Sequence, residues 1–398
     1  MSFQEDIFNN FIRLNRGFDL PDANLVEGIY PVVASTSIKA YHKESRVKGP
    51  GVVTGRSGSL GTVQYVPGDY WPLNTALYVK DFKGNFPKFV FYFLQQMHLE
   101  SFNSGAGVPT LNQNHLHKLK IQIPKLTFQR KIATILSAYD ELIENNQRRI
   151  ALLEKMAEEI YREWFVRLRF PGHEKVKFVK GMPDGWQPVP SNKVFNVLSG
   201  GTPNTDNPLY WDGDIPFFTP RDAGENYYIL KTEENLTPKG LDSCNSRLYK
   251  KDTIFITARG TVGKIGLAYR DMAMNQSCYA LTPREEGAVY FYFLSMKNAI
   301  TYIKGVSKSG VFDNIIVDTF KVVPFFLPPQ PLIAQFNEIT TPIFRQLGML
   351  LEANEQLVKM RDALLPRLIS GKLSVENLGI QFPPSMAEEM KTEPAAHA

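Results

Sequence analysis

Two long stretches of the chain place apolar residues at the spacing of a helix that packs along a partner helix. In the first stretch the spacings alternate between three and four residues, which is a heptad pattern. The positions that follow it are Leu136, Tyr139, Ile143, Asn146, Ile150, Leu153, Ala157, Ile160 and Trp164. The pattern ends at Phe170-Pro171-Gly172, a sequence that stops helices.

The second stretch lies near the end of the chain and follows the same rule. Its positions are Phe336, Ile339, Ile343, Leu347, Leu350, Asn354, Leu357, Leu364 and Leu368. Arg361 interrupts this seam, and the sequence "SGKL" from Ser370 supplies a glycine at which the helix can end. Two long helices with such seams can pair, and we expect them to form an antiparallel coiled coil.

Each seam contains one asparagine, Asn146 in "LIENNQ" and Asn354 in "LLEANEQ". A lone polar residue in a seam costs stability and typically fixes the register of the two helices. The alternative is that both asparagines face solvent at the edge of their helix. The sequence alone favours neither interpretation.

The segments between the long helices resemble each other. The sequence "FYFL" occurs at residues 91–94 and again at 291–294. "VVTGRSGSLGTV" from Val52 and "FITARGTVGKI" from Phe255 each place two glycines three residues apart after an apolar strand. Further matches follow in the same order, with an offset that drifts only between 200 and 204 residues. The chain is therefore predicted to be a tandem duplication whose halves have diverged.

This organisation predicts an α+β fold with a pseudo-twofold internal repeat. Two mixed, β-rich domains stand in tandem, separated by the two long helices of the antiparallel coiled coil. The expected boundaries are residues 1–125 for the first domain, 126–171 for the central helix, 172–328 for the second domain, 329–373 for the C-terminal helix and 374–398 for a disordered tail.

Composition narrows the class of protein. Of the 398 residues, 43% are hydrophobic and 21% are charged, as in a globular protein, and no run of eighteen apolar residues predicts a membrane span. The start lacks the features of a signal peptide, and Cys244 and Cys278 suit a reducing cytoplasm, so we expect a cytoplasmic protein. The net charge of +5 permits a nucleic-acid partner without requiring one.

Two stretches look like catalytic motifs but lack their context. "NPLY" at Asn207 is similar to the Asn-Pro-Pro-Tyr loop of adenine N6-methyltransferases, yet it stands in a polar loop with no preceding βαβ series. "GTVGK" at Gly260 is not a phosphate-binding P-loop, because Ala258 stands where the motif needs glycine and Ile265 where it needs serine or threonine.

No metal site or nucleophile–base set is predicted either. His115 and His117 are the only close histidine pair, and neither a cysteine nor paired carboxylates stand beside them. We therefore expect a binding protein with no catalytic residue and no metal.

Basic and small polar residues in loops are the candidates for DNA contact. Arginine and lysine near phosphates give affinity, whereas side chains at base edges read sequence. The candidates are Lys39, Lys43, Arg46, Lys48, Arg56 and Ser57 in the first domain, and Arg221, Lys250, Arg259, Thr261, Lys264, Lys304 and Lys308 in the second. For any one of them, a solvated surface charge is the alternative.

Arg56 and Arg259 are the strongest of these candidates. Each stands in a glycine-flanked turn directly after a predicted buried strand, where a ligand backbone can approach closely. We expect the two turns to be equivalent, although a purely structural arginine in a tight turn is a fair alternative.

The predicted length of the helices suggests what two such domains could do. A helix of about forty residues is about 60 Å long at 1.5 Å per residue. One turn of B-DNA is about 34–36 Å. Two reading domains held apart by such a spacer could face successive major grooves. Because the halves have diverged, the predicted target is split and asymmetric, with unread base pairs between its halves.

The chain resembles the specificity subunits of type I DNA restriction–modification systems over nearly its whole length. "MPDGWQ" at Met182 and "GGTPNTDNPLYWDGDIPFFTPRDA" at Gly200 look like the opening of a target recognition domain of that family. "YREWFVRLRFP" at Tyr161 and "LLPRLISGKLSV" at Leu364 look like its two helix endings. The first domain departs from the pattern because it lacks the "LPxGW"-type entry.

This resemblance implies a non-catalytic subunit with two target recognition domains and two conserved helices. In the family, one such subunit binds double-stranded DNA and two modification subunits, which carry S-adenosylmethionine and methylate adenine at N6. Restriction subunits add ATP- and Mg-dependent translocation and cleavage, and helix length sets the spacer between half-sites. No cofactor is then expected in this chain. The alternatives are a stand-alone adenine N6 methyltransferase using the "NPLY" loop and a coiled-coil scaffold that binds proteins.

Overall fold

The computed structural model describes residues 1–105, 107–306 and 314–383, with side chains in helix α7 described as far as Thr301. The chain forms two compact units, and both long helices run from one unit into the other. Unit 1 comprises residues 1–143 together with 356–398, and unit 2 comprises residues 144–355.

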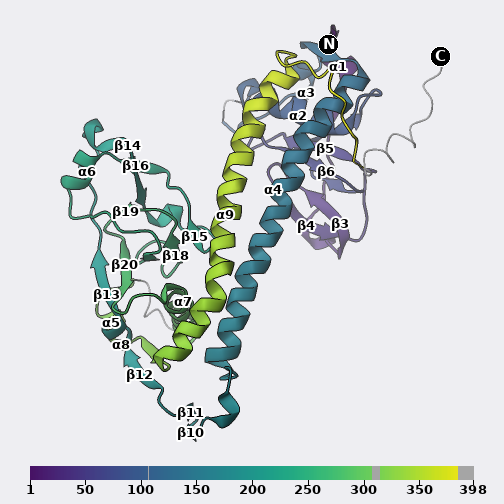
Figure 1. Ribbon diagram of the computed structural model, residues 1–398. Helices are drawn as coiled ribbons and strands as arrows, with labels where there is room; N and C mark the ends of the chain where they lie inside the picture. The colour runs from purple at the N-terminus through teal and green to yellow at the C-terminus, as the bar shows by residue number, and fades with distance from the viewer. Residues whose placement is uncertain (106, 307–313, 384–398) are drawn as a thin grey trace. The chain divides into compact units, whose positions relative to one another are not determined.

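The two long helices pair in opposite directions, as the heptad patterns predict (Figure 1). Helix α4 spans Leu126–Tyr161 and continues as one π-helical segment, Arg162–Val166, and helix α9 spans Gln330–Ile369. In unit 1, Asp140 of α4 pairs with Arg361 of α9 at 2.6 Å. In unit 2, the Asn146 amide donates to the Asn354 side-chain oxygen at 2.9 Å. Residue numbers fall on one helix as they rise on the other.

The predicted seam of α4 is buried or half-buried along its length, with Leu136 and Ala157 fully buried. The prediction is wrong at one position of the α9 seam. Ile339 is 43% exposed, and the neighbouring Thr340 is fully buried in its place. The Thr340 hydroxyl donates to the carbonyl oxygen of Phe336 at 3.0 Å, so this small polar side chain is satisfied inside its own helix.

Unit 1 contains three small sheets and the short helix α2. The strand orders are β2–β8–β5–β6, β4–β3–β7 and β1–β9. Their bounds are β1 Phe3–Ile7, β2 Arg13–Arg16, β3 Glu27–Val33, β4 Ile38–His42, β5 Gly51–Gly55, β6 Val63–Val66, β7 Trp71–Pro72, β8 Ala76–Asp81 and β9 Lys120–Pro124. The helices, besides α4 and α9, are α1 Phe8–Phe11, α2 Pro87–Gln96 and α3 Gln113–Leu116.

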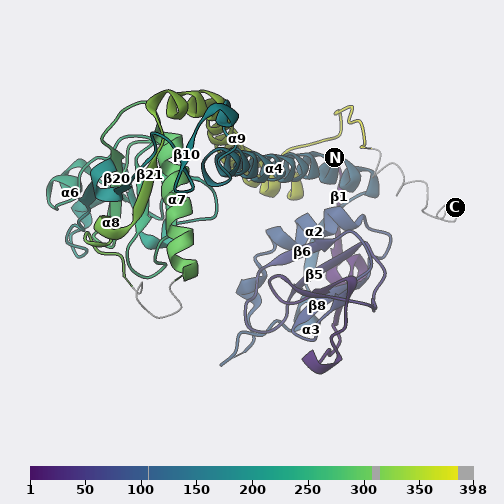
Figure 2. The same ribbon diagram turned by 90° about the horizontal axis from the view of Figure 1, so that it is seen from below.

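Helix α2 forms because Pro87 stands at its first position and an apolar face follows it. Its residues Phe89, Val90 and Leu94 are buried in one core with Val52 of β5 and Leu136 of α4. Figure 2 shows α2 between the start of α4 and the strands of the larger sheet. This helix therefore joins the globular part of unit 1 to the long helices.

Unit 2 repeats this plan with additional elements. Its strand orders are β13–β20–β17–β18–β15, β16–β14–β19, β12–β21 and β10–β11. The bounds are β10 Phe178–Val179, β11 Met182–Pro183, β12 Gln187–Pro190, β13 Phe195–Ser199, β14 Trp211–Phe218, β15 Tyr228–Ile229, β16 Glu234–Leu236, β17 Ile254–Thr257, β18 Ile265–Ala268, β19 Ala273–Met274, β20 Cys278–Pro283 and β21 Pro324–Leu327. Its helices are α5 Ser191–Val194, α6 Pro238–Asp242, α7 Val289–Val306 and α8 Thr319–Val322.

Hydrogen bonds show that the repeat has a constant register through the sheets. The amide of Arg56 donates to Thr75, and the amide of Ala258 donates to Ser277, so both partners are displaced by 202 residues. Helices α2 and α7 also begin 202 residues apart. The "FYFL" tetrapeptides, 200 residues apart, therefore mark the same helix but occupy positions two residues out of step.

The chain after α9 is ordered further than the sequence predicts. The disordered tail was expected from residue 374, but Val375 is fully buried in the unit 1 core. The Lys131 ammonium group donates to the carbonyl oxygens of Val375, Glu376 and Leu378 at 3.2, 2.9 and 2.8 Å. These bonds hold the segment against the start of α4. Residues 384–398 of the expected tail lie outside the described part of the chain.

Candidate nucleic-acid interface

The turn after strand β5 is braced by neighbouring loops in unit 1. The amides of Arg56 and Ser57 donate to the carbonyl oxygen of Thr75 at 2.9 and 3.1 Å, and the amide of Leu111 donates to the carbonyl oxygen of Arg56 at 2.8 Å. Gly58 and Gly61 have φ values of 86° and 92°, which side chains with a Cβ rarely adopt. The sequence therefore builds a rigid, glycine-containing edge at this point.

Arg56 is partly used inside this turn. Its side chain is half-buried, and Nη1 donates to the carbonyl oxygen of Asn74 at 3.0 Å. The guanidinium group has five N–H donors, so the remaining ones can serve another acceptor. The Ser57 carbonyl oxygen accepts a bond from the Ser35 hydroxyl at 3.1 Å.

The corresponding turn of unit 2 follows strand β17. Ala258 is buried, and its amide donates to the carbonyl oxygen of Ser277 at 2.8 Å. The amide of Ile315 donates to the carbonyl oxygen of Ala258 at 3.0 Å, as Leu111 does to Arg56 in unit 1. Gly260 and Gly263 have φ values of 76° and 71°. Arg259 is exposed at the tip of this turn.

The two turns share one hydrogen-bond pattern, but Arg56 and Arg259 stand one residue out of step within it. The hydrogen bonds show that Arg56 corresponds to Ala258, and the same offset of 202 residues makes Ser57 the counterpart of Arg259. Each glycine of the first turn lies 202 residues before its counterpart in the second turn, which is also the offset between the hydrogen-bonded residues. The two arginines are 203 residues apart. Each turn thus carries one arginine, but the two side chains leave the backbone at adjacent positions: Arg56 is half-buried and Arg259 is exposed.

Four predicted residues of unit 2 come together around its turn. The Thr261 hydroxyl donates to the carbonyl oxygen of Pro220 at 3.3 Å, and Nζ of Lys264 donates to the carbonyl oxygen of Ala223 at 3.0 Å. Arg221 is exposed and lies between these two contacts in the sequence, on the 3-10 turn Pro220–Asp222. We name Arg221, Arg259, Thr261 and Lys264 the turn cluster. Lys264 also contacts Glu225 at 3.3 Å, a surface pair that contributes little to stability.

The basic residues of the β3–β4 region form a separate group in unit 1. Lys39 pairs with Asp22 at 2.6 Å, Lys43 lies 3.7 Å from Glu44, and the Arg46 guanidinium group stands 4.7 Å from the centre of the Trp71 ring. The hydrogen bond from Lys39 lowers the pKa of the Asp22 carboxyl. Such exposed pairs can exchange a carboxylate for a phosphate at small cost.

Lys48 and Lys250 occupy equivalent positions that sequence matching missed. The bridge between Val47 and Tyr70 recurs 202 residues later between Tyr249 and Met272. Lys48 is exposed, whereas Lys250 pairs with Asp271 at 2.8 Å. The hydrogen bond from Lys250 holds the pKa of the Asp271 carboxyl below its usual range.

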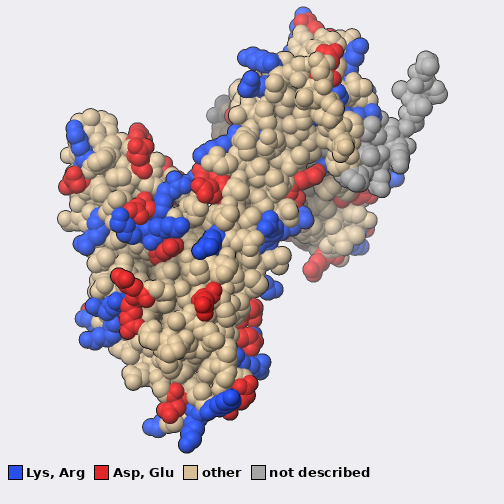
Figure 3. Space-filling model, viewed as in Figure 1, with Lys and Arg blue, Asp and Glu red and all other residues tan. Residues whose placement is uncertain are grey.

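Two further candidates cannot be placed by their side chains. Lys304 lies in the last turns of α7, where only the backbone is described, and Lys308 lies outside the described residues. On the face drawn in Figure 3, basic and acidic side chains are interspersed. Any phosphate contact on that face would therefore come from small local groups of basic side chains.

The "NPLY" stretch forms a structural cap. Asn207 precedes the 3-10 turn Pro208–Tyr210, and its side-chain oxygen accepts a hydrogen bond from the Leu209 amide at 3.1 Å. This is an ordinary role for asparagine at a helix start. The amide oxygen is thus already bonded to the backbone that follows it.

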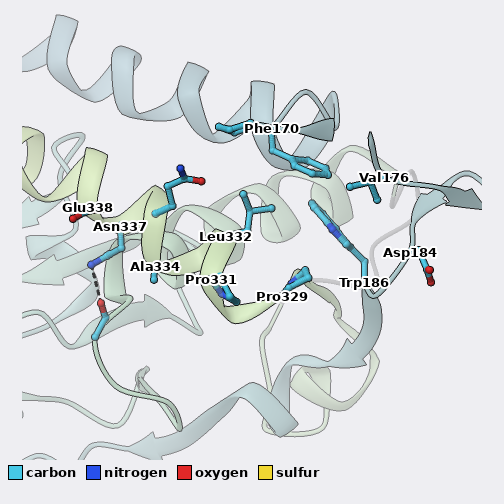
Figure 4. Close-up of a pocket in the computed structure, with 13 residues that line it drawn as sticks. Phe170, Val176, Asp184, Trp186, Pro329, Pro331, Leu332, Ala334, Asn337 and Glu338 are labelled. Carbon is cyan, nitrogen blue, oxygen red and sulfur yellow. Dashed lines mark hydrogen bonds between the residues drawn. The ribbon is translucent and has the colours of Figure 1, made fainter. Parts of the chain in front are cut away.

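A cavity of about 830 Å³ lies in unit 2, away from the turn cluster. Phe170, Trp186 and Leu332 lie around it, and the Asn337 amide beside it donates to the carbonyl oxygen of Gly287 at 2.8 Å (Figure 4). None of the residues predicted to contact DNA lines this cavity. In the part of the chain that the structure describes, no three His, Cys, Asp or Glu side chains converge as metal ligands.

A polar junction that sequence reasoning missed joins three helices in unit 1. The Tyr92 hydroxyl of α2 contacts Oδ2 of Asp140 at 2.5 Å, and Nη1 of Arg361 donates to Oδ1 of the same carboxylate at 2.6 Å. Burial, and then the charge of Asp140, hold the pKa of Tyr92 well above its usual range. The one sequence signal for this junction is the interruption of the α9 seam by Arg361.

Comparison with known proteins identifies the class to which this fold belongs. A family model described as the type I restriction modification DNA specificity domain matches residues 2–155 and again residues 183–340. The chain therefore belongs to this family, with the domain present twice.

The relatives are specificity subunits of type I restriction enzymes. The MjaIX specificity subunit of Methanocaldococcus jannaschii is 25% identical over 289 residues, which are 71% of this chain and 67% of the relative. The HindI specificity subunit of Haemophilus influenzae is 22% identical over 328 residues, 67% of this chain and 71% of the relative. Within such enzymes the specificity subunit is the non-catalytic component that recognises the DNA target.

A solved structure supports the fold. The crystal structure of a type I restriction–modification S subunit from M. genitalium covers 92% of this chain and 96% of its own, with a TM-score of 0.63 and 19% identity. Two recognition domains and two antiparallel long helices are thus the architecture of this chain. No described helix is long and apolar enough to cross a membrane.

Proposed function

We propose that each recognition domain reads one half of an asymmetric, split DNA site. The observation that supports this most directly is the pair of turns after β5 and β17. Their backbones share one hydrogen-bond register, yet one presents Arg56 and Ser57 where the other presents Ala258 and Arg259. Two turns with the same backbone arrangement but different side chains should read different bases, because base edges are distinguished by the positions of their hydrogen-bond donors and acceptors.

The candidate residues divide into two roles in this proposal. Arg56, Ser57 and the turn cluster stand on rigid backbone and are assigned to base reading. Lys39, Lys43, Arg46, Lys48 and Lys250 stand on exposed strands or loops and are assigned to phosphate contact. Phosphate contacts position the protein without carrying sequence information.

The paired helices act in this proposal as a spacer and as a docking surface. In unit 2 the sides of α4 and α9 that carry Leu152, Met156 and Met349 are open, with exposed fractions of 66%, 45% and 63%. Tyr227 packs on α4 through Glu154, which lies on a different face of that helix. Exposed apolar residues spaced along helices are typical of a surface that a further helix covers.

The partners proposed for this surface are two modification subunits, which bring S-adenosylmethionine and methylate adenine in both half-sites. Restriction subunits, with ATP and Mg, would complete the complex. The chain itself contributes target recognition and belongs to a family that typically binds no cofactor.

The test is to purify the chain with the proposed modification subunits and to select binders from a random duplex library. We expect one enriched motif made of two different short sequences with unread base pairs between them. Enrichment of a single continuous motif, or of none, would overturn the proposal. The chain assayed alone for S-adenosylmethionine should show no binding, and tight binding would favour a stand-alone methyltransferase.

A further inference from the structure

Helix α2 is fixed to α4 in unit 1 at two polar points that each include a buried side chain, and a partly exposed ion pair between Lys88 and Glu141 at 3.4 Å adds a weaker contact beside the second point. At the first, the buried side chain of Gln129 accepts a hydrogen bond from the Phe86 amide at 2.9 Å and donates to the Asn85 side chain at 2.7 Å. Both partners precede the first turn of α2. Removal of either bond would leave a buried amide unsatisfied, which is costly.

The second point is the junction of Tyr92, Asp140 and Arg361. Tyr92 is 2% exposed, so its hydroxyl has little access to water as an alternative partner. Asp140 belongs to α4 and Arg361 to α9, so one carboxylate holds the recognition domain and both long helices together. Charge-assisted bonds of this kind are shorter and stronger than neutral ones.

The two points lie far apart along α4. Gln129 and Asp140 are eleven residues apart on α4, which corresponds to about 16 Å along the helix axis. Two attachments so far apart fix the angle between α2 and α4. A single attachment would act as a pivot, and the apolar contacts of Phe89 and Phe93 between them are less directional.

In unit 2 the attachment is spread over more contacts. Lys297 of α7 pairs with Glu158 at 2.9 Å, the Tyr269 hydroxyl contacts Glu352 at 2.9 Å, and Tyr290 stacks on Phe344 with ring centres 4.1 Å apart. Glu158 belongs to α4, and Glu352 and Phe344 belong to α9. If any one of these contacts is lost, the others still attach the domain to the long helices at other positions.

We infer that Tyr92, Asp140 and Arg361 are positioning residues that determine how strictly the spacer between the two half-sites is measured. This inference rests on the proposed function, because a spacer exists only if the site is split. If the junction is lost, only the partly exposed pair of Lys88 with Glu141 still opposes a tilt of the first domain about Gln129, and the reading turn can shift relative to the helix pair. One base-pair step is about 3.4 Å, so a small tilt admits a neighbouring spacer length.

The test measures binding of the complex with modification subunits to duplexes that keep both half-sites and vary the spacer by one base pair. The variants are Tyr92→Phe, which removes only the hydroxyl, and Arg361→Met. Glu144→Gln is the control, because Glu144 forms an exposed pair with Arg148 on the same helix. Wild type and control should prefer one spacer length.

In Tyr92→Phe, which removes the bond from α2, we expect that preference to fall by about three- to tenfold, as expected for the loss of one positioning hydrogen bond. Arg361→Met keeps the bond from Tyr92, so its preference should fall by less. The preferred half-site sequences should not change. An equal loss of affinity at all spacer lengths, or an unchanged preference, would overturn the inference. If the wild-type complex binds no split site, the proposed function fails, and the inference fails with it.

Discussion

At the scale of single residues, Arg259 is the sharpest candidate for base reading. It is exposed at the tip of a turn whose backbone is fixed by Gly260 and by the hydrogen bond from Ile315 to Ala258. Arg259→Ala should cost about 1–3 kcal/mol of binding free energy and relax one half of the motif only. Competition binding with each half-site randomised in turn measures this. The control is Lys250→Ala, because Lys250 is assigned to phosphate contact. An equal loss on every sequence would make Arg259 a phosphate contact.

Asp252 offers a test of stability rather than recognition. Burial raises the pKa of its carboxyl, although the side chain accepts a bond from the Tyr228 hydroxyl at 3.1 Å. Its φ of 64° lies in the left-handed region, which asparagine tolerates well. Asp252→Asn should therefore keep the hydrogen bond and remove the cost of burying a charge.

The sign of its pH dependence follows from linkage. A carboxyl whose pKa is raised in the folded state favours folding below its unfolded pKa and loses that contribution as pH rises through the folded pKa. Thermal unfolding should show that the stability of Asp252→Asn rises relative to that of wild type as pH rises from 4 to 7. The expected gain is up to about 1 kcal/mol after allowance for solvent screening. A difference that does not change with pH would contradict this account.

The residue scale is also where the sequence was least informative. The glycine-flanked turns were predictable because glycine is required at positive φ, and all four glycines adopt it. That Arg56 and Ala258 occupy corresponding positions of the repeat was not predictable, since it depends on long-range hydrogen bonds to Thr75 and Ser277. The junction of Tyr92 with Asp140 likewise joins residues 48 apart in the chain.

At the scale of elements, the heptad seams predicted both long helices and their antiparallel pairing. The pattern works there because one buried stripe must hold over many turns. The shorter elements were harder, because strands such as Trp71–Pro72 and Ala273–Met274 contain too few residues to show a period. The tetrapeptide "FYFL" identified α2 and α7 as counterparts but not their register, since aromatic residues occupy several buried positions of each helix.

The length of the long helices can be changed to test whether it sets the spacer. A heptad inserted into α4 between Asp140 and Asn146, with a second in α9 between Asn354 and Arg361, keeps both polar pairs aligned. Each insert adds about 10 Å, so the unread spacer should lengthen by about three base pairs. Methylome sequencing of a host that expresses the variant measures the spacer. Unchanged spacing, with both half-sites still read, would refute the role of the helices as a ruler.

At the scale of the whole molecule, the duplication explains why one chain should read an asymmetric site. Each recognition domain begins and ends in a two-stranded sheet, β1 with β9 in unit 1 and β12 with β21 in unit 2. Phe3 pairs with Pro124, and Gln187 pairs with Leu327, so the ends of each domain lie side by side. A domain with adjacent ends can be exchanged without disturbing the helices that follow it.

This geometry permits a chimera that tests the source of the asymmetry. Residues 3–124 replace residues 187–327, so that the same recognition domain stands at both positions of the repeat. Because the helices are unchanged, the spacer should stay the same, while both half-sites become the sequence read by the first domain in inverted orientation. Selection from a random duplex library, after circular dichroism has shown that the chimera is folded, gives the answer. A folded chimera that still selects two different half-sites would mean that the helices or the partner subunits, and not the domains, read the DNA.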